Sequence, residues 1–236
     1  MDGETPEPKG RAVSRQALRD QENLWADLLR LASAVQEMLG LAVRALSEGQ
    51  ASLAEDVKQR ERAIDGWEVR IERECLRVLA LYEPVASDFR RLGAMLKVNG
   101  DLERISNLSR NVAKRVRKLS ADPQAFPISD AMAKLAAGVD THVGRTLDAL
   151  SRIDPTLARS VIDGDTEIDR VYHSVLDELK GEVRREPHRL DTWLREINAA
   201  RDLERIADHA VNIAESVVYM SEGDIIRHPA DAPSPT

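Results

Sequence analysis

The chain contains two copies of one segment. The residues Asp-Leu-Glu-Arg-Ile at 101–105 recur at 202–206, and three further identities follow in register as Asn111, Ala113 and Val116 match Asn212, Ala214 and Val217. The offset of 101 residues is close to half of a 236-residue chain. A duplication of this length predicts two domains of the same fold, one after the other.

Each copy reads as helical. Aromatic residues make up 3% of the chain and charged residues 32%, a composition that favours helices over strands. The last segment places Leu203, Ile206, Ala210, Ile213 and Val217 at alternating spacings of three and four. This spacing is typical of a helix that packs one apolar stripe into a bundle. We therefore predict an all-α protein of two tandem three-helix bundles.

Prolines and polar turns set the expected boundaries. Pro84 and Pro187 each follow a glutamate, and the residue before a proline is driven out of the helical region. The predicted helices span 14–46, 51–81, 84–119, 129–152, 155–185 and 187–220. The predicted bundles are 14–121 and 128–222, with disordered tails at 1–13 and 225–236.

Charge and cysteine content narrow the function. A net charge of −7 argues against a broadly cationic nucleic-acid surface. The basic run from Lys114 to Lys118 is a solvated helix face or, alternatively, a contact for an acidic partner. Cys75 is the only cysteine, which excludes an intrachain disulfide, and we expect it to be buried. With no segment apolar enough for a signal peptide or a membrane span, we expect a cytoplasmic protein.

Acidic residues four apart lie on facing helices of each predicted hairpin. Because residues four apart share a helix face, each pair can point at the other helix. In the first copy the pairs centre on Pro84, and in the second they centre beside Pro187, so both pairs of a copy reach the same level. The candidate site residues are Glu61, Asp65, Glu103 and Asn107 in the first copy, and Asp165, Asp169, Glu204 and Asp208 in the second.

Clustered carboxylates repel each other unless a positive charge neutralises them. Nearby arginines would give a salt-bridge network; the candidates are Arg62, Arg104, Arg170 and Arg205. A metal ion is the alternative. Oxygen donors favour Mg, Mn, Ca or Fe over structural zinc, although Zn remains a candidate. His173 and His209 lie beside these acids, but we expect neither to be a ligand.

Enzyme motifs are not found in this sequence. Di-metal carboxylate enzymes of the ferritin type need a Glu three residues before a ligand His, and none of the five histidines has one. The sequence also lacks a phosphate-cradling Gly-rich loop and a Gly-x-Ser-x-Gly elbow. We therefore expect a protein that is not an enzyme.

Several of these segments together resemble the PhoU family. The most similar is the segment at 202–215, Asp-Leu-Glu-Arg-Ile-Ala-Asp-His-Ala-Val-Asn-Ile-Ala-Glu. The segments at 81–90, 101–105 and 161–169 are also similar to the family's patterns. The resemblance covers both repeats, roughly residues 14–222.

The resemblance implies a fold, a site and a role. PhoU-like proteins are two similar three-helix bundles whose acidic motifs can bind metal clusters, and here that role falls on the acids named above. The family restrains the Pst phosphate ABC transporter and couples it to a phosphate-sensing histidine kinase. The resemblance therefore implies a homodimeric adaptor that acts by docking to the transporter ATPase and the kinase. A related module that regulates another transporter is the alternative.

Two positions depart from the family pattern. Asn107 stands where the family has Asp, so the first site loses one anionic ligand. The second hairpin enters through Glu186-Pro187-His188-Arg189 rather than the Pro-Val-Ala form of the first. We therefore expect the second site to be the stronger one.

Overall fold

The computed structural model describes residues 15–122 and 125–226. Six long helices account for nearly all of them, and the described residues contain no strand. The helices are α1 (Arg15–Glu48), α2 (Ala51–Tyr82), α3 (Ala86–Leu119), α4 (Asp130–Arg152), α5 (Pro155–Arg185) and α6 (Leu190–Glu222), and a 3-10 turn, η1 (Pro187–Arg189), precedes α6. The all-helical prediction is confirmed. The predicted tails are 1–13 and 225–236, and all of their residues except Ile225 and Ile226 lie outside the described residues.

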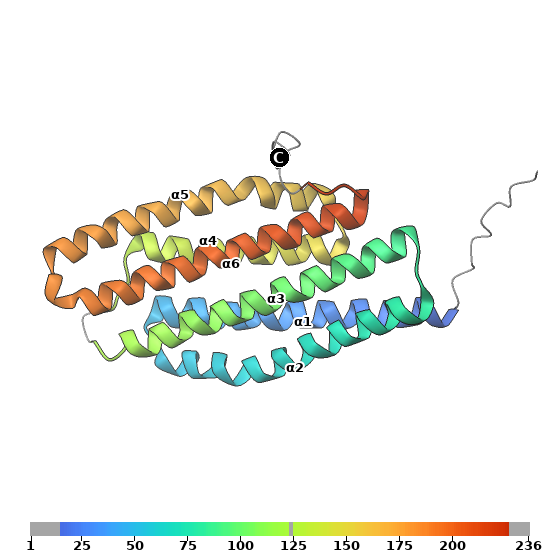
Figure 1. Cartoon of the computed structure of the whole chain (residues 1–236). Helices are drawn as coiled ribbons and strands as arrows, with labels where there is room; N and C mark the ends of the chain where they lie inside the picture. Colours follow the sequence, from blue (N-terminus) through green and yellow to red (C-terminus); the bar gives the residue numbers. More distant parts are fainter. Residues whose placement is uncertain (1–14, 123–124, 227–236) are drawn as a thin grey trace, which may run out of the picture.

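Each repeat forms one three-helix bundle, and the two bundles lie side by side (Figure 1). In the first, α1, α2 and α3 contact one another, and in the second α4, α5 and α6 do the same. The bundles meet where α3 packs on α6 and where α1 packs on α4. The α2–α3 tip and the α5–α6 tip lie at opposite ends of the molecule (Figure 1). This arrangement brings the two copies of the repeated motif, on α3 and α6, to the middle of the protein.

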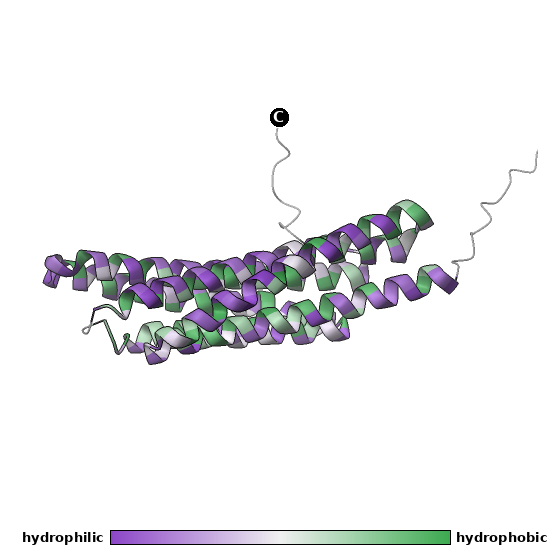
Figure 2. Ribbon diagram, turned by 90° about the horizontal axis from the view of Figure 1, so that it is seen from below, coloured by the Kyte–Doolittle hydropathy of each residue, from purple (hydrophilic) through white to green (hydrophobic). Residues whose placement is uncertain are grey.

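The predicted apolar stripes form the core. All five stripe residues of α6 are fully buried, and so are Leu102, Ile105, Val112 and Val116 on α3. Hydrophobic and hydrophilic residues alternate along every helix (Figure 2), as expected when each helix buries one stripe. The helices therefore hold their polar faces in fixed positions relative to one another.

Two predicted helix starts are wrong. The chain does not resume the helix at Pro84, because Glu83 adopts a left-handed conformation and Val85 is extended, so α3 begins at Ala86. In the second repeat, Pro187 begins η1 rather than α6. There Arg189 stacks over the Trp193 ring at 4.4 Å and pairs with Asp122 at 3.4 Å, which fastens the turn to the linker between the bundles.

Other helix ends follow their sequence signals. The Asp154 side chain caps α5 by accepting hydrogen bonds from the backbone N–H groups of Thr156 and Leu157 at 2.9 and 3.0 Å. Gly49 after α1 has a φ of +66°, and a Cβ there would lie 2.8 Å from the Phe126 ring. Only glycine fits this turn, because it must be left-handed and also admit the linker residue.

Cys75 is fully buried, as predicted, and burial raises the pKa of its thiol to about 12, so it is an inert core residue. Within the described helices, none is both long and apolar enough to cross a bilayer.

Candidate functional site

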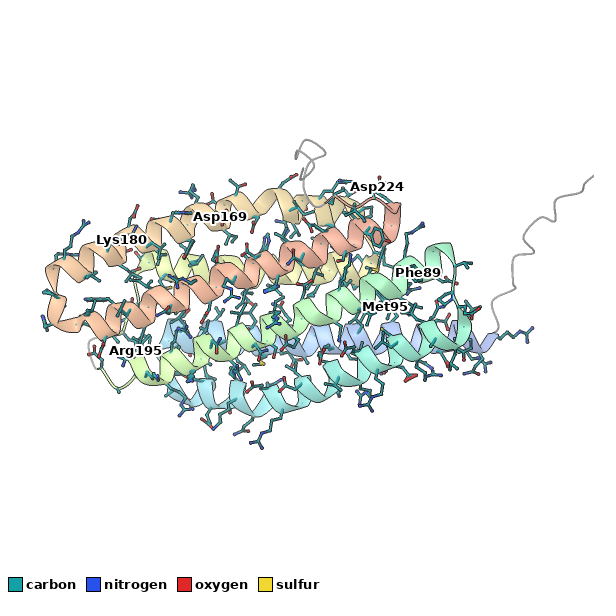
Figure 3. The ribbon with its side chains drawn as sticks, viewed as in Figure 1. Phe89, Met95, Asp169, Lys180, Arg195 and Asp224 are labelled. Atoms are coloured by element: carbon teal, nitrogen blue, oxygen red, sulfur yellow. The ribbon has the colours of Figure 1, made fainter. Side chains whose placement is uncertain are left out.

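The second repeat gathers four carboxylates between α5 and α6. Asp165 and Asp169 lie on α5, where Figure 3 labels Asp169, and Glu204 and Asp208 lie on α6. Burial and the charges of Asp169 and Asp208 raise the pKa of Asp165 to about 6. The pKa values of Glu204 and Asp208 are raised as well, by burial first and then by neighbouring acids of this set. The four side chains therefore lie within electrostatic range of one another.

Arginines only partly offset this repulsion. Arg170 is directed to Glu167, with a nitrogen to oxygen distance of 2.6 Å. The charge of Arg205 lowers the pKa values of Glu204 and Asp208, but burial and the neighbouring acids outweigh it. The second cluster thus keeps an excess of negative charge in a half-buried position. Such a cluster attracts a cation.

In the first repeat, the acidic side chains form ion pairs and hydrogen bonds with other protein groups. Glu61 pairs with Arg110 of α3 rather than with Arg62. Within α3, the Asn107 amide donates a hydrogen bond to the Glu103 carboxylate one turn earlier. Arg104 adds a contact to Glu103 at 3.5 Å. Here protein groups already compensate much of the negative charge.

Glu68 is an acid of the first repeat that the sequence analysis missed. Burial, followed by the charges of Glu72, Glu103 and Asp65, raises its pKa. Its signal was in the sequence, since residues 61, 65, 68 and 72 are all acidic at spacings of four, three and four. The acidic stripe of α2 is therefore longer than the pair first considered.

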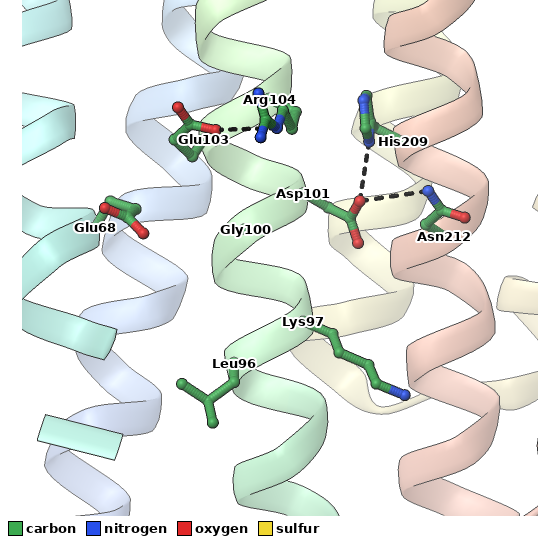
Figure 4. A pocket seen from close by; sticks show the side chains of 9 residues that line it. All are labelled: Glu68, Leu96, Lys97, Gly100, Asp101, Glu103, Arg104, His209 and Asn212. Carbon is green, nitrogen blue, oxygen red and sulfur yellow. Dashed lines mark hydrogen bonds and ion pairs between the residues drawn. The ribbon is translucent and has the colours of Figure 1, made fainter. Parts of the chain in front are cut away.

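A polar contact joins the two bundles next to this stripe. His209 Nδ1 lies 2.9 Å from Asp101 Oδ1, and the Asn212 amide donates to the same oxygen at 3.3 Å. These residues border a pocket of about 580 Å³ between the bundles, with Glu68 and Glu103 on its other side (Figure 4). His209 therefore joins the two repeats, and its charge also lowers the pKa of Asp208 in the second cluster.

Two other histidines lie near the second cluster. His173 is exposed, and its Nδ1 is 2.8 Å from the backbone oxygen of Asp169. His142 on α4 is buried, and its Nε2 lies 3.9 Å from Asp165 Oδ1. The sequence analysis did not consider His142. Its position on the apolar stripe of α4, three residues after the buried Val139, was the available signal.

The donor chemistry of the second cluster fits a divalent cation. Four carboxylates and an imidazole are the ligand types that such ions take in proteins. Within the described part of the chain, no three acidic, histidine or cysteine side chains already converge on one point suited to a metal. Binding an ion here would therefore require the carboxylates to rotate inward.

Known proteins resemble this chain in sequence over both repeats. The PhoU domain family matches residues 28–116 and 132–217. The chain belongs to the PhoU family. A Pseudomonas aeruginosa relative, described as a phosphate-specific transport system accessory protein PhoU homolog, is 35% identical over 216 residues, which cover 92% of this chain and 89% of the relative. An Aquifex aeolicus protein with the same description is 34% identical over 89% of this chain and 95% of its own length.

Solved structures of PhoU proteins share the fold. The crystal structure of PhoU from Pseudomonas aeruginosa superposes with a TM-score of 0.85 at 34% identity, over 88% of this chain and 99% of that one. The phosphate transport system regulatory protein PhoU from Streptococcus pneumoniae gives a TM-score of 0.82 at 25% identity, over 90% of this chain and all of that one. PhoU proteins are accessory and regulatory proteins rather than enzymes, as we had predicted for this chain.

Proposed function

We propose that this protein is a regulatory adaptor of phosphate uptake. It restrains a phosphate ABC transporter and silences phosphate-starvation signalling when phosphate is plentiful. The observation that carries the proposal is the match of the PhoU domain to both repeats, in a fold shared along nearly the whole chain with phosphate transport regulators. The adaptor works in the cytoplasm by docking to the transporter ATPase and to a phosphate-sensing histidine kinase. The family resemblance also leads us to propose a homodimer, which light scattering of the purified chain tests.

We assign the ATPase contact to the α2–α3 tip. Leu81, Val85 and Phe89 are 61%, 72% and 56% exposed there, and Figure 3 shows Phe89 near this end of α3. Clusters of large exposed apolar side chains mark interaction surfaces. The opposite tip exposes its leucines less, with Leu190 at 44% and Leu194 at 45%, and its Trp193 is buried, with the indole N–H donating to the Glu186 backbone oxygen at 3.2 Å. The α2–α3 tip is therefore the better docking surface.

Deletion of the gene in its native host tests the regulatory role. We expect phosphate-starvation genes to be expressed constitutively in phosphate-rich medium, because the transporter signal is no longer restrained. Normal repression in the deletion strain would overturn the proposal.

Complementation of that strain tests the docking surface. The Val85→Ser/Phe89→Ser double variant should fold normally, because exposed substitutions change stability little. It should nevertheless fail to restore repression and fail to retain the ATPase in a pull-down. Leu190→Ser/Leu194→Ser at the other tip is the matched control, since these leucines are also partly exposed. Equal behaviour of the two double variants would remove the assignment to the α2–α3 tip.

We also propose that the second cluster binds a divalent metal ion, with Mg, Mn, Fe and Zn as candidates. Asp165, Asp169, Glu204 and Asp208 would hold it. The ion would supply positive charge and fix α5 against α6. Burial first, and then the neighbouring acids, raise the pKa values of Asp165, Glu204 and Asp208, and a cation held among them would relieve the repulsion between the acids. In the first repeat Glu61, Asp65, Glu103 and Asn107 form a weaker site, since Arg110 and the Asn107 amide already contact its acids.

A further inference from the structure

His142 is an unusual residue for the core of a helical bundle. It is 5% exposed and follows Val139 along the buried stripe of α4. The imidazole of histidine is a common ligand of metal ions in proteins.

The Nε2 atom of His142 has no hydrogen-bond partner among the described residues, although it is fully buried. The acid it faces is Asp165, whose Oδ1 is 3.9 Å away and beyond hydrogen-bonding distance. Buried polar atoms in native proteins are nearly always satisfied, and an unsatisfied one signals a missing water, ion or functional role. The structure thus leaves one buried nitrogen directed at the acidic cluster.

The separation of these two atoms suits ligands of one ion. Transition-metal ions bind imidazole nitrogen and carboxylate oxygen at about 2.0–2.2 Å. Two donors at that distance lie roughly 3 Å apart when the angle at the metal is 90° and roughly 4.2 Å apart when it is 180°. The observed 3.9 Å falls inside this range. A metal ion between these atoms would give the unpartnered Nε2 of His142 a ligand bond and would neutralise the negative charge of the Asp165 carboxylate.

The first repeat has no counterpart to this nitrogen. Residues of α4 and α5 match those of α1 and α2 at an offset of 104, which places Asp165 opposite Glu61 in the alignment and His142 opposite Met38. Met38 is fully buried and accepts a hydrogen bond from the Ser106 hydroxyl at 3.4 Å. The imidazole is therefore a feature of the second repeat alone.

We propose that His142 is a ligand of the ion at the second cluster, through Nε2 and together with Asp165. The inference rests on the metal site proposed above. The imidazole of His142 would determine which metal ions that site prefers. Carboxylates alone suit Mg²⁺ and Ca²⁺, whereas an added imidazole shifts preference toward Zn²⁺, Fe²⁺ or Co²⁺. The second repeat thus holds a mixed imidazole–carboxylate site for a transition-metal ion.

Metal titration of the full-length chain tests this proposal. Wild-type protein, His142→Leu, His173→Leu and Glu204→Ala/Asp208→Ala are stripped with a chelator and titrated with Co²⁺, Zn²⁺ and Mg²⁺. We expect His142→Leu to weaken Zn²⁺ binding by at least about tenfold and to change the visible absorption of bound Co²⁺. Its Mg²⁺ affinity should stay close to that of the wild type. His173→Leu is the control, because His173 is exposed and its Nδ1 contacts a backbone oxygen rather than a carboxylate.

Each outcome separates this inference from the metal site itself. Wild-type Zn²⁺ affinity and an unchanged Co²⁺ spectrum in His142→Leu would overturn the role of His142. If Glu204→Ala/Asp208→Ala nevertheless loses the metal, the acidic site stands without it. Failure of the wild-type protein to bind any of the three ions would overturn the site and the inference together.

A second measurement uses only the wild-type protein and so does not require any variant to fold. The imidazole ¹⁵N resonances of wild-type protein are recorded before and after Zn²⁺ addition. We expect the Nε2 resonance of His142 to shift while those of His173 stay in place, and an unmoved His142 resonance in the Zn²⁺-loaded protein would overturn the proposal.

Discussion

The two repeats share a scaffold but treat its acidic groups in opposite ways. In the first, Glu61 is paired with Arg110 and Glu103 accepts a hydrogen bond from Asn107. In the second, burial and then the charges of neighbouring acids raise the pKa values of Asp165 and Glu204. The duplicated helices give both sites the same framework, so the difference comes from a few side chains. A duplicated fold can therefore keep one half as structure and leave charge uncompensated in the other for binding.

Truncation of the matched core leucines should show how alike the scaffolds are. Leu102 and Leu203 occupy equivalent positions, and both are fully buried. We expect Leu102→Ala and Leu203→Ala each to cost about 2–5 kcal/mol in the free energy of unfolding, by loss of apolar contact and creation of a cavity. The melting temperature should fall by roughly 2–4 °C for each kcal/mol of unfolding free energy that is lost. A cost below about 1 kcal/mol at either site would show that one bundle core is poorly packed.

A buried glutamate distinguishes the repeats more sharply. Glu196 on α6 is buried where the first repeat has Met95. Burial raises the pKa of Glu196 from 4.5 to about 7, so the native state holds a proton that the unfolded state releases. Stability is therefore lost as pH rises from about 4.5 to 7. Glu196→Met should stabilise the protein at pH 8 by up to about 3 kcal/mol and by much less at pH 5.

Melting curves of the wild type and of Glu196→Met, recorded at several pH values, check the predicted pH-dependent gain in stability. The control is Glu22→Met on α1, because Glu22 is exposed and is not among the charges that act on Glu196, so it should not reproduce this gain. The same gain for Glu196→Met at pH 5 and pH 8 would contradict the titration of Glu196 in this range.

Restoring the missing acid in the first repeat should make its metal binding more similar to that of the second repeat. Asn107→Asp removes the hydrogen bond to Glu103 and places a second carboxylate beside it. We expect the metal-free protein to lose about 1 kcal/mol in stability. The first repeat of this variant should bind a metal ion more tightly than that of the wild type. Elemental analysis, and melting temperatures measured with and without a chelator, would show this. Asn111→Asp, one turn further along α3, is the control, and equal effects of the two would contradict a specific site.

The smallest expected effect comes from releasing Glu61. Arg110 is partly exposed, so its pair with Glu61 contributes at most about 1 kcal/mol. Arg110→Ala should therefore change melting little while raising the metal affinity of the first repeat, as measured by calorimetric titration. Arg117→Ala, which removes a more exposed pair with Glu55, should leave metal binding unchanged. A lower affinity in Arg110→Ala would mean that the arginine supports the site instead of competing for it.

The sequence predicted the framework well because periodicity and prolines fix it locally. The spacing of three and four along α6 identified its buried stripe, and hairpin symmetry placed Asp165 and Asp169 level with Glu204 and Asp208. The start of α3 at Ala86 escaped prediction, because the left-handed Glu83 depends on how the turn closes.

The site partners that the sequence analysis missed come from other helices or other turns. Arg110 reaches Glu61 across the hairpin, and His142 approaches Asp165 from α4. Such contacts depend on side-chain length and on the relative rotation of neighbouring helices. Neither quantity is encoded in the spacing of acids along one helix.

The contacts between α3 and α6 have a consequence for how the two halves recognise each other. Asp101 of the first half meets His209 and Asn212 of the second, while Asp202 of the second meets Arg115 of the first at 2.8 Å. The repeat equivalents of His209 and Arg115 are Leu108 and Ser216, which offer a carboxylate no comparable charge. The duplicated halves have thus become complementary instead of identical, because each half supplies a different kind of partner to the other half's carboxylate.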